Sequence, residues 1–423
     1  MNRRVIKKKL YQEVIYDVHG VRNSKVRIAL RFSSLCLRAL GGALLTLVLA
    51  PISLFRPIEI WQMNSRLPKI SFFIESLETG LRDLQSRNQA GRVWIIALYP
   101  ISFPNRQLAK MYRRHVSILG KKQRWIAESA RFVWPIFRVV KKSVVDRSEN
   151  KFTIWNAGKP TLSFTAGETK KGMSLFKDLD LPLGKPYVCF AIASKTYREL
   201  VDMKQSFGTL TNNDLFTIIP ELSSYFPFIN DLTSKDISIV RMGIHEEFRL
   251  PESLGNLAHD YAFSHQSAFG DVWLSSNCQY FVSAGAVGAW WFGATFGRPT
   301  VMTDSYALRG SLSSNDLFIP QLAWLIHENR LATFEWMADN YMWAIDSNRL
   351  GKEYYIVHNT SQQILDVNNE MLQRLDDTWL DTDEDLELQS RLRSVQMSLN
   401  IGERAPARMG AKFLREHQHL LPQ

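Results

Sequence analysis

Residues 271–304 read DVWLSSNCQYFVSAGAVGAWWFGATFGRPTVMTD and place a glycine-rich turn between two short apolar runs. The first half predicts a helix that passes into a strand, and the second half predicts a helix, a turn and another strand. PYVCFAIA (186–193) and DISIVRMG (236–243) have the length and the Gly or Pro boundaries of buried strands. Strands that alternate with helices predict a doubly wound parallel sheet and therefore an α/β fold.

The rest of the chain predicts a second α/β domain and helical ends. GRVWIIALYP (91–100) is typical of a buried strand, and the linker LPLGKP (181–186) marks a boundary. From residue 318 onward we expect mainly helices, the last of them amphipathic. The expected domains are 1–60, 61–183, 184–350 and 351–423.

Composition excludes several classes of protein. The 423 residues are 45% hydrophobic and 22% charged, which excludes a disordered or collagen-like chain. The three cysteines are scattered and form no C-x-x-C pair, which argues against a disulfide scaffold or a cysteine zinc site and favours a reducing compartment. His245, His259 and His265 lack metal-ligand spacing, so we expect no metal cofactor.

The positive charge is concentrated in two segments. The net charge is +11, but residues 1–38 carry ten Lys/Arg against two acids, and residues 106–142 carry eleven against Glu128 alone. The rest of the chain is therefore mildly acidic. This asymmetry predicts an anionic partner, which could be a membrane surface, a nucleic acid or a phosphorylated substrate.

An uncharged stretch, ALGGALLTLVLAPISLF (39–55), follows the first basic segment. It is shorter than the roughly 20 apolar residues of a membrane span, and Pro51 interrupts its end. An interfacial or re-entrant anchor, a single span and a buried core helix all remain open. With the basic flank beside it, we expect a protein attached to the cytoplasmic side of the inner membrane.

The second basic segment, 106–142, alternates apolar and Lys/Arg residues at helical spacing, with Trp125, Trp134 and Phe137 among them. A solvated helix face and a nucleic-acid site are possible interpretations, but no nucleic-acid motif accompanies the segment. An amphipathic element at an anionic membrane surface or a lipid-phosphate substrate is favoured, so we expect no nucleic-acid partner.

Two places at strand ends could bind a phosphate. Arg241 and Gly243 follow a predicted strand, where a guanidinium and a close backbone approach suit an anion; the alternative is that Arg241 pairs with a structural carboxylate such as Asp260 or Asp271. The second place is the glycine-rich run 283–297, with Gly285 and Gly288. It matches neither G-x-G-x-x-G nor a P-loop, and close helix packing would explain the same glycines.

Several blocks together resemble a family of bacterial glycosyltransferases linked to surface-carbohydrate synthesis. They occur in order and cover nearly all of the chain after residue 60: RLPKISFFIESLETGL (66–81), YPISFPNRQLAKMYRR (99–114), KPYVCF (185–190), SIVRMG (238–243), DYAFSHQSAFGDVWLSSNCQYFVS (260–283), FGRP (296–299), NDLFIPQL (315–322), HNTSQQILDVNNEML (358–372) and MGAKFLREHQHLL (409–421).

The resemblance implies a GT-B-like architecture of two facing Rossmann-like domains, with an acceptor domain at 61–183 and a donor domain for a nucleotide-sugar at 184–350. An N-terminal membrane-associated helix and a C-terminal helical region would complete it. The acceptor would be a lipid-linked glycan or an oligosaccharide. Donor-binding residues would be Arg241, Gly243, Asp260, Ser264, Asp271, Gly285 and Gly288. No catalytic base is evident, and His245 and Glu246 are the candidates.

The chain departs from the family pattern at polar positions. Ser71-Phe72 stands where the family has a Gly-His pair, and Ala191-Ile192-Ala193 where it has His-x-Arg. Ala286-Val287 replaces small hydroxyl residues, and Gln321 replaces a Lys. Two functions are therefore open: a membrane-associated glycosyltransferase, or a catalytically degenerate homologue that acts as a scaffold or regulator in a glycan-assembly complex.

Overall fold

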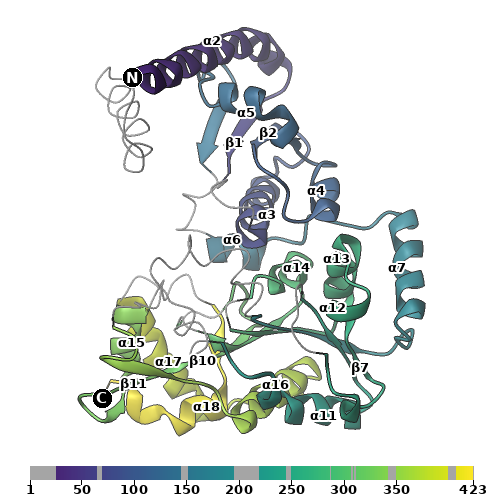
Figure 1. Cartoon of the computed structure of the whole chain (residues 1–423), viewed down its shortest axis with the longest axis vertical. Helices are drawn as coiled ribbons and strands as arrows, with labels where there is room; N and C mark the ends of the chain where they lie inside the picture. Colours follow the sequence, from purple (N-terminus) through teal and green to yellow (C-terminus); the bar gives the residue numbers. More distant parts are fainter. Residues whose placement is uncertain are drawn as a thin grey trace. The chain divides into compact units, whose positions relative to one another are not determined.

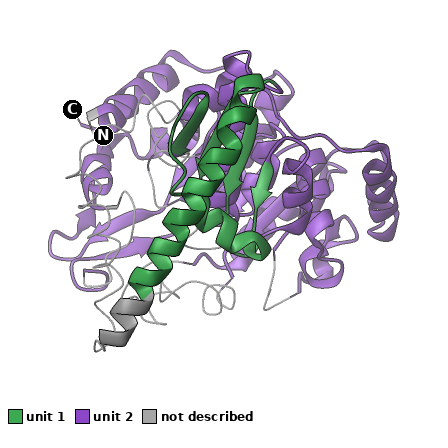
Figure 2. Ribbon diagram, turned by 90° about the horizontal axis from the view of Figure 1, so that it is seen from above, with its two compact units in different colours: residues 1–62, 92–102, 117–142 green, residues 63–91, 103–116, 143–423 purple. Residues whose placement is uncertain are grey.

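The computed structural model describes residues 25–63, 69–143, 151–194, 219–243, 249–285, 287–305, 308, 311–341, 349–398 and 406–422. The chain forms two compact units, coloured green and purple in Figure 2. Unit 1 comprises residues 1–62, 92–102 and 117–142, and unit 2 comprises residues 63–91, 103–116 and 143–423. The two units are defined by contacts between residues and do not test the expected domain boundaries at residues 60, 183 and 350, which stay a prediction.

Unit 1 is built on a four-stranded sheet of order β3-β2-β1-β4, in which β1, β2 and β3 run parallel. In the core of unit 1, Ile60 and Ile96 of the sheet belong to one hydrophobic cluster with Leu49 and Ala127, which lie on helices. The strand predicted within 91–100 is confirmed as β2. The elements are α2 (Lys25–Phe55), β1 (Ile58–Gln62), β2 (Trp94–Leu98), β3 (Ser117–Leu119), η1 (Lys121–Gln123), α5 (Arg124–Ala130) and β4 (Val139–Ser143).

Helix α2 packs closely on α5 through a pair of glycines. A Cβ atom on Gly41 would lie 2.5 Å from Ser129 Oγ, and one on Gly42 would lie 2.6 Å from Phe132 Cβ. Helix α2 continues through Pro51 to Phe55 instead of ending there. Pro51 has no N–H to donate to the carbonyl of residue 47, so the helix continues past it without that hydrogen bond.

The basic segment 106–142 is not one amphipathic helix, so the helical spacing was misleading. It contains α4 (Arg106–Tyr112), β3, η1, α5 and β4, and it contributes to both units. Val116, Ile118 and Val139 explain the difference. These β-branched side chains are buried, and Ile118 and Val139 lie on strands of the unit 1 sheet.

Unit 2 contains a seven-stranded sheet of order β14-β10-β9-β8-β5-β6-β7, and every neighbouring pair is parallel. The strands are β5 (Tyr187–Ile192), β6 (Ser238–Arg241), β7 (Ala258–His259), β8 (Phe281–Ala284), β9 (Thr300–Ser305), β10 (Leu317–Pro320) and β14 (Arg408–Met409). The chain order reverses between β5 and β8. The predicted α/β class, with parallel sheets and an N-terminal apolar helix, is confirmed.

Helices cover both faces of this sheet. Figure 1 shows α13 (Ala268–Asn277) and α14 (Trp290–Thr295) on one face, and α11 (Phe226–Ser234) and α16 (Ser361–Leu375) on the other. The other helices among the described residues of unit 2 are α3 (Ile70–Ser86), α4, α6 (Lys151–Ala157), α7 (Ala166–Asp178), η3 (Leu222–Tyr225), η4 (Glu252–Leu254), α12 (Tyr261–Ser264), α15 (Phe334–Tyr341), α17 (Asp383–Ser398), α18 (Ala411–Glu416) and η6 (Gln418–Leu420).

The region after residue 318 is not helical at first, contrary to the expectation. It forms an antiparallel sheet of order β12-β11-β13, with β11 (Leu322–Leu325), β12 (Arg330–Leu331) and β13 (Tyr354–Val357). Leu322, Leu325 and Tyr354 are buried in the core of unit 2. Packing of these strands therefore outweighs the local helical pattern, and apart from the short α15 the described helices of this region begin only at Ser361.

Candidate functional site

The carboxyl edge of the seven-stranded sheet is the expected place for a ligand. In a doubly wound sheet, ligands bind beyond the carboxyl ends of the strands where the strand order reverses, which here is between β5 and β8. Residues 195–218, 244–248, 286, 306–307 and 309–310, which follow four of these strands in the chain, lie outside the described residues. His245 and Glu246, the candidates for a catalytic base, fall among them.

Gly285 directly follows β8 at this reversal point. Its φ is +70°, a left-handed conformation that favours glycine, and its N–H donates to the Thr303 carbonyl at 2.9 Å. A Cβ atom here would lie 3.5 Å from that of Ala193 at the end of β5. Gly288 differs, because a Cβ atom there would lie 2.9 Å from Ile70 Cγ2. Close packing therefore explains Gly288, whereas Gly285 is required by the backbone turn.

Arg241 ends β6 and Asp260 directly follows the neighbouring β7, and the two side chains lie close together. Arg241 Nη1 is 3.6 Å from Asp260 Oδ2, which also accepts from the Leu250 N–H at 2.8 Å. Only 2% of Arg241 is exposed. Arg241 therefore has Asp260 as its carboxylate neighbour, which is one of the two acids with which the sequence predicted it could pair instead of binding an anion. Gly243 follows with φ +151°, and the binding of a donor by these residues stays a prediction.

Asp271 belongs to a separate cluster at the start of α13. It accepts from Tyr261 Oη at 3.1 Å and from Gln266 Nε2 at 2.9 Å. Burial raises the pKa of Asp271 to about 7. Asp260 is thus the carboxylate beside Arg241, whereas Asp271 holds the loop before α13. The Ser264 hydroxyl donates to the Asp260 carbonyl at 3.0 Å and so orders the same turn.

A polar pair at the same edge was missed from the sequence. Asp304, on β9, is fully buried, and its Oδ1 is 2.9 Å from Nδ1 of His358. Asp304 Oδ1 also accepts from the Asn359 N–H at 3.0 Å, and Oδ2 accepts from Tyr225 Oη at 2.9 Å. Burial raises the pKa of Tyr225 well above its usual range, so its hydroxyl stays a donor.

The backbone at Asp304 is strained. Its φ is +50°, which is uncommon for a residue with a side chain, and such strain clusters at functional sites. The Asp304 N–H donates to Asn359 Oδ1 at 2.6 Å, so the loop before α16 holds this conformation in place. His358 is 31% exposed, so an otherwise buried network reaches the surface at its imidazole.

The pair has the chemistry of an oriented base. A buried carboxylate at Nδ1 keeps the proton on that nitrogen and makes Nε2 the atom that accepts a proton. The Gln321 amide lies 3.5 Å from the same Nδ1, directly after β10, the strand that neighbours β9. Polar residues directly after apolar strands, VMTD (301–304) and YIVHN (355–359), were the available signal in the sequence.

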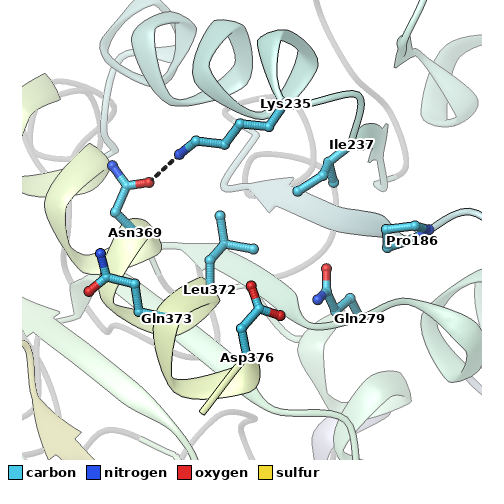
Figure 3. A pocket seen from close by; sticks show the side chains of 8 residues that line it. All are labelled: Pro186, Lys235, Ile237, Gln279, Asn369, Leu372, Gln373 and Asp376. Carbon is cyan, nitrogen blue, oxygen red and sulfur yellow. Dashed lines mark hydrogen bonds between the residues drawn. The ribbon is translucent and has the colours of Figure 1, made fainter. Parts of the chain in front are cut away.

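A cavity of about 480 Å³ lies at the opposite, amino edge of the sheet (Figure 3). It is lined by Pro186, Lys235, Ile237, Gln279, Asn369, Leu372, Gln373 and Asp376. Its position before β5, β6 and β8, away from the carboxyl ends, makes it a poor candidate for the site of chemistry. Within the described residues, no group of three or more His, Cys, Asp or Glu is arranged to bind a metal.

Comparisons with known proteins find structural similarity alone. No protein-family model and no curated protein matches the chain. The structure is similar to the Escherichia coli ADP-heptose LPS heptosyltransferase II, with 12% identity, 58% of this chain and 83% of that chain covered, and a TM-score of 0.34. It is also similar to a family 9 glycosyl transferase from Veillonella parvula (8%; 58% and 80%; TM-score 0.33) and to E. coli heptosyltransferase WaaC with ADP (10%; 62% and 90%; TM-score 0.28). At these values the similarities carry no argument about activity.

Proposed function

We propose that the chain is a membrane-associated glycosyltransferase at the cytoplasmic side of the inner membrane. It transfers a sugar from a nucleotide-sugar to a surface-glycan acceptor that is lipid-linked. The blocks that resemble bacterial glycosyltransferases support this class, as does the parallel sheet with polar side chains at its carboxyl edge. The observation that carries the proposal is the Asp304–His358 pair, because it offers a base at the edge where a donor would bind.

In this proposal His358 takes the proton of the acceptor hydroxyl on Nε2. The hydroxyl oxygen forms a bond to the anomeric carbon of the sugar as the bond from that carbon to the phosphate oxygen breaks. The nucleoside diphosphate leaves with the electron pair of that bond. Asp304 stabilises the imidazolium that forms. Arg241, beside Asp260, and the turn at Gly285 would face the diphosphate.

The first experiment measures the thermal stability of the full chain in detergent against UDP, GDP, CDP, ADP, CMP and dTDP, each with and without magnesium. A ligand at 100 times its dissociation constant adds about 2.7 kcal/mol of stability. One stabilising nucleotide would name the sugar-nucleotides to test for transfer. The absence of any shift, from a cooperatively folded sample, would contradict a donor site.

Substitutions then test the base. We expect His358→Gln and Asp304→Asn each to lower transfer at least 100-fold, because general-base catalysis contributes about 10²–10⁴ in rate. Nucleotide binding should change much less, since neither side chain is assigned to the diphosphate. His327→Gln, at an exposed turn, is the matched control and should keep full activity.

The alternative is a degenerate homologue that acts as a scaffold or regulator. Ala191 and Ala193, at the end of β5, are buried and offer no polar side chain at the reversal point. Nucleotide binding without transfer from any sugar-nucleotide would favour this alternative. An Arg241→Ala variant that folds stably and leaves the glycan of the producing cell unchanged would favour it too.

A further inference from the structure

Unit 1 carries a continuous apolar stripe along α2. Leu37, Leu40, Leu44, Leu47 and Phe55 recur three to eight residues apart and are exposed, Leu47 at 71% and Phe55 at 90%. This spacing places them along one side of the helix. The segment Arg31–Phe55 is the one described helix that is long and apolar enough to cross a membrane. An exposed apolar surface of this extent marks an interaction site.

Three exposed aromatic side chains lie along α2: Trp125, Trp134 and Phe137. The guanidinium carbon of Arg38 lies over the Trp125 ring, 5.8 Å from the centroid of that ring. Further along, the Trp134 N–H donates to Thr46 Oγ1 at 3.0 Å, so Trp134 lies beside the middle of α2. Phe137 is 73% exposed and precedes Arg138, whose guanidinium reaches the Leu54 carbonyl. The three side chains therefore follow α2 from residue 38 to residue 54.

Exposed basic side chains accompany these aromatic residues. Lys121, Lys122 and Arg124 are exposed at the start of α5, next to Trp125. Arg138 is exposed next to Phe137. Aromatic rings interleaved with Lys and Arg are typical of an element at the membrane interface, where the rings enter the headgroup region and the cations meet lipid phosphates.

The packing of α2 argues against a span. Its other side is held against α5 by Gly41 and Gly42, and Leu49 is buried in the core of unit 1. At the level of these glycines, Glu128 of α5 pairs with Arg38 at 3.5 Å. A spanning α2 would carry this ion pair and the unit 1 sheet into the hydrocarbon, where charged groups are costly.

We infer that α2 lies in the plane of an anionic bilayer surface. Its leucine stripe enters the acyl boundary together with Trp125, Trp134 and Phe137, while Lys121 and Lys122 bind headgroup phosphates. This inference concerns unit 1 alone. It does not depend on glycosyl transfer, because its tests measure membrane binding and depth without any activity.

Depth measurements distinguish an α2 helix that lies in the plane of the bilayer surface from one that spans the bilayer. In a Cys36→Ser background, Leu40, Leu47 and Leu54 are each replaced by Cys and labelled with an environment-sensitive fluorophore. Quenchers fixed at known depths in phosphatidylcholine/phosphatidylglycerol vesicles then locate each label in the full chain. We expect three equal, shallow depths. Because a helix rises about 1.5 Å per residue, a span would spread these depths over roughly 20 Å and overturn the inference.

Vesicle sedimentation tests the contribution of the basic side chains to membrane binding. Each basic residue near an anionic surface contributes about fivefold in binding, so replacing Lys121, Lys122 and Arg124 by Gln should weaken binding to 30% phosphatidylglycerol vesicles roughly 100-fold. Binding to phosphatidylcholine vesicles should change little. The matched control replaces exposed lysines of unit 2 by Gln and should bind as the wild type does: Lys159, Lys170 and Lys177. An equal loss in the control would contradict the assignment of the charge to unit 1.

A last pair of variants tests the apolar contact. Leu44→Glu together with Leu47→Glu should abolish vesicle binding, whereas Leu380→Glu, at an exposed leucine of unit 2, should not. If the wild-type chain fails to bind vesicles and instead sediments as a dimer that Leu47→Glu dissociates, a second copy covers the stripe and the inference is wrong.

Discussion

Among the substitutions considered, we expect Glu78→Gln to cause the largest loss of stability. Glu78 is fully buried on α3, and Arg82, one turn later, donates to it from Nε at 2.8 Å. Tyr112 Oη donates to it at 3.1 Å, and Thr161 donates from Oγ1 at 2.6 Å and from N at 3.1 Å. The pair therefore connects α3 to two distant segments of unit 2.

The magnitude follows from what Glu78→Gln leaves behind. Breaking a buried ion pair by removing one charge costs about 3–5 kcal/mol, because the other charge stays buried without compensation. Arg82 still donates to the carbonyls of Trp155, Gly158 and Thr295 at 3.0–3.2 Å and stacks over the Trp155 ring. These contacts partly solvate the guanidinium, so we expect a loss of about 3 kcal/mol.

The control is a second pair with the same i,i+4 spacing on the same helix. Arg87 Nη2 lies 2.7 Å from Asp83 Oδ2, but this pair is solvent-accessible, and exposed helix pairs contribute about 0.3–0.5 kcal/mol. Unfolding in guanidinium chloride, followed by tryptophan fluorescence, would give the change in the free energy of unfolding for Glu78→Gln and for Asp83→Asn. A loss below 1 kcal/mol for Glu78→Gln, or equal losses for Glu78→Gln and Asp83→Asn, would refute the reasoning.

Three further predictions concern stability. In α7, Gly172→Ala should lower the midpoint of unfolding, because its Cβ atom would lie 2.0 Å from Cε2 of Trp273, and overpacking costs about 1–3 kcal/mol. Gly167→Ala in the same helix meets nothing within 4 Å and should raise the midpoint by the equivalent of about 0.5–1 kcal/mol, so equal effects of the two changes would contradict this packing argument. Burial raises the pKa of Asp271 to about 7 and that of Asp316 to about 6, so between pH 4 and 7 the folded chain holds protons that the unfolded chain has released, and stability falls as the pH rises. Asp271→Asn should reduce that fall between pH 5 and pH 8 in thermal unfolding, and an unchanged slope would show that the carboxyl titrates normally.

Much of the fold could be predicted from local sequence. Buried parallel strands are short apolar runs with Gly or Pro at their ends, and the runs within 91–100, 186–193 and 236–243 became β2, β5 and β6. The pattern failed within 106–142 and after 318, where β-branched or apolar residues join sheets. There the pairing partner decided the local structure, and helical spacing could not reveal it.

The candidate site was only partly predictable, for a geometric reason. Arg241 and Gly285 were found because each lies at the end of a short apolar run, and this is visible in a window of a few residues. Asp304 and His358 are 54 residues apart, and their contact depends on the strand order and on the loop that brings α16 to the end of β9. The sequence by itself determined which segments are strands and where charge accumulates. Only the tertiary structure decided which polar side chains meet and which side of α2 stays exposed, because both depend on contacts between segments far apart in the chain.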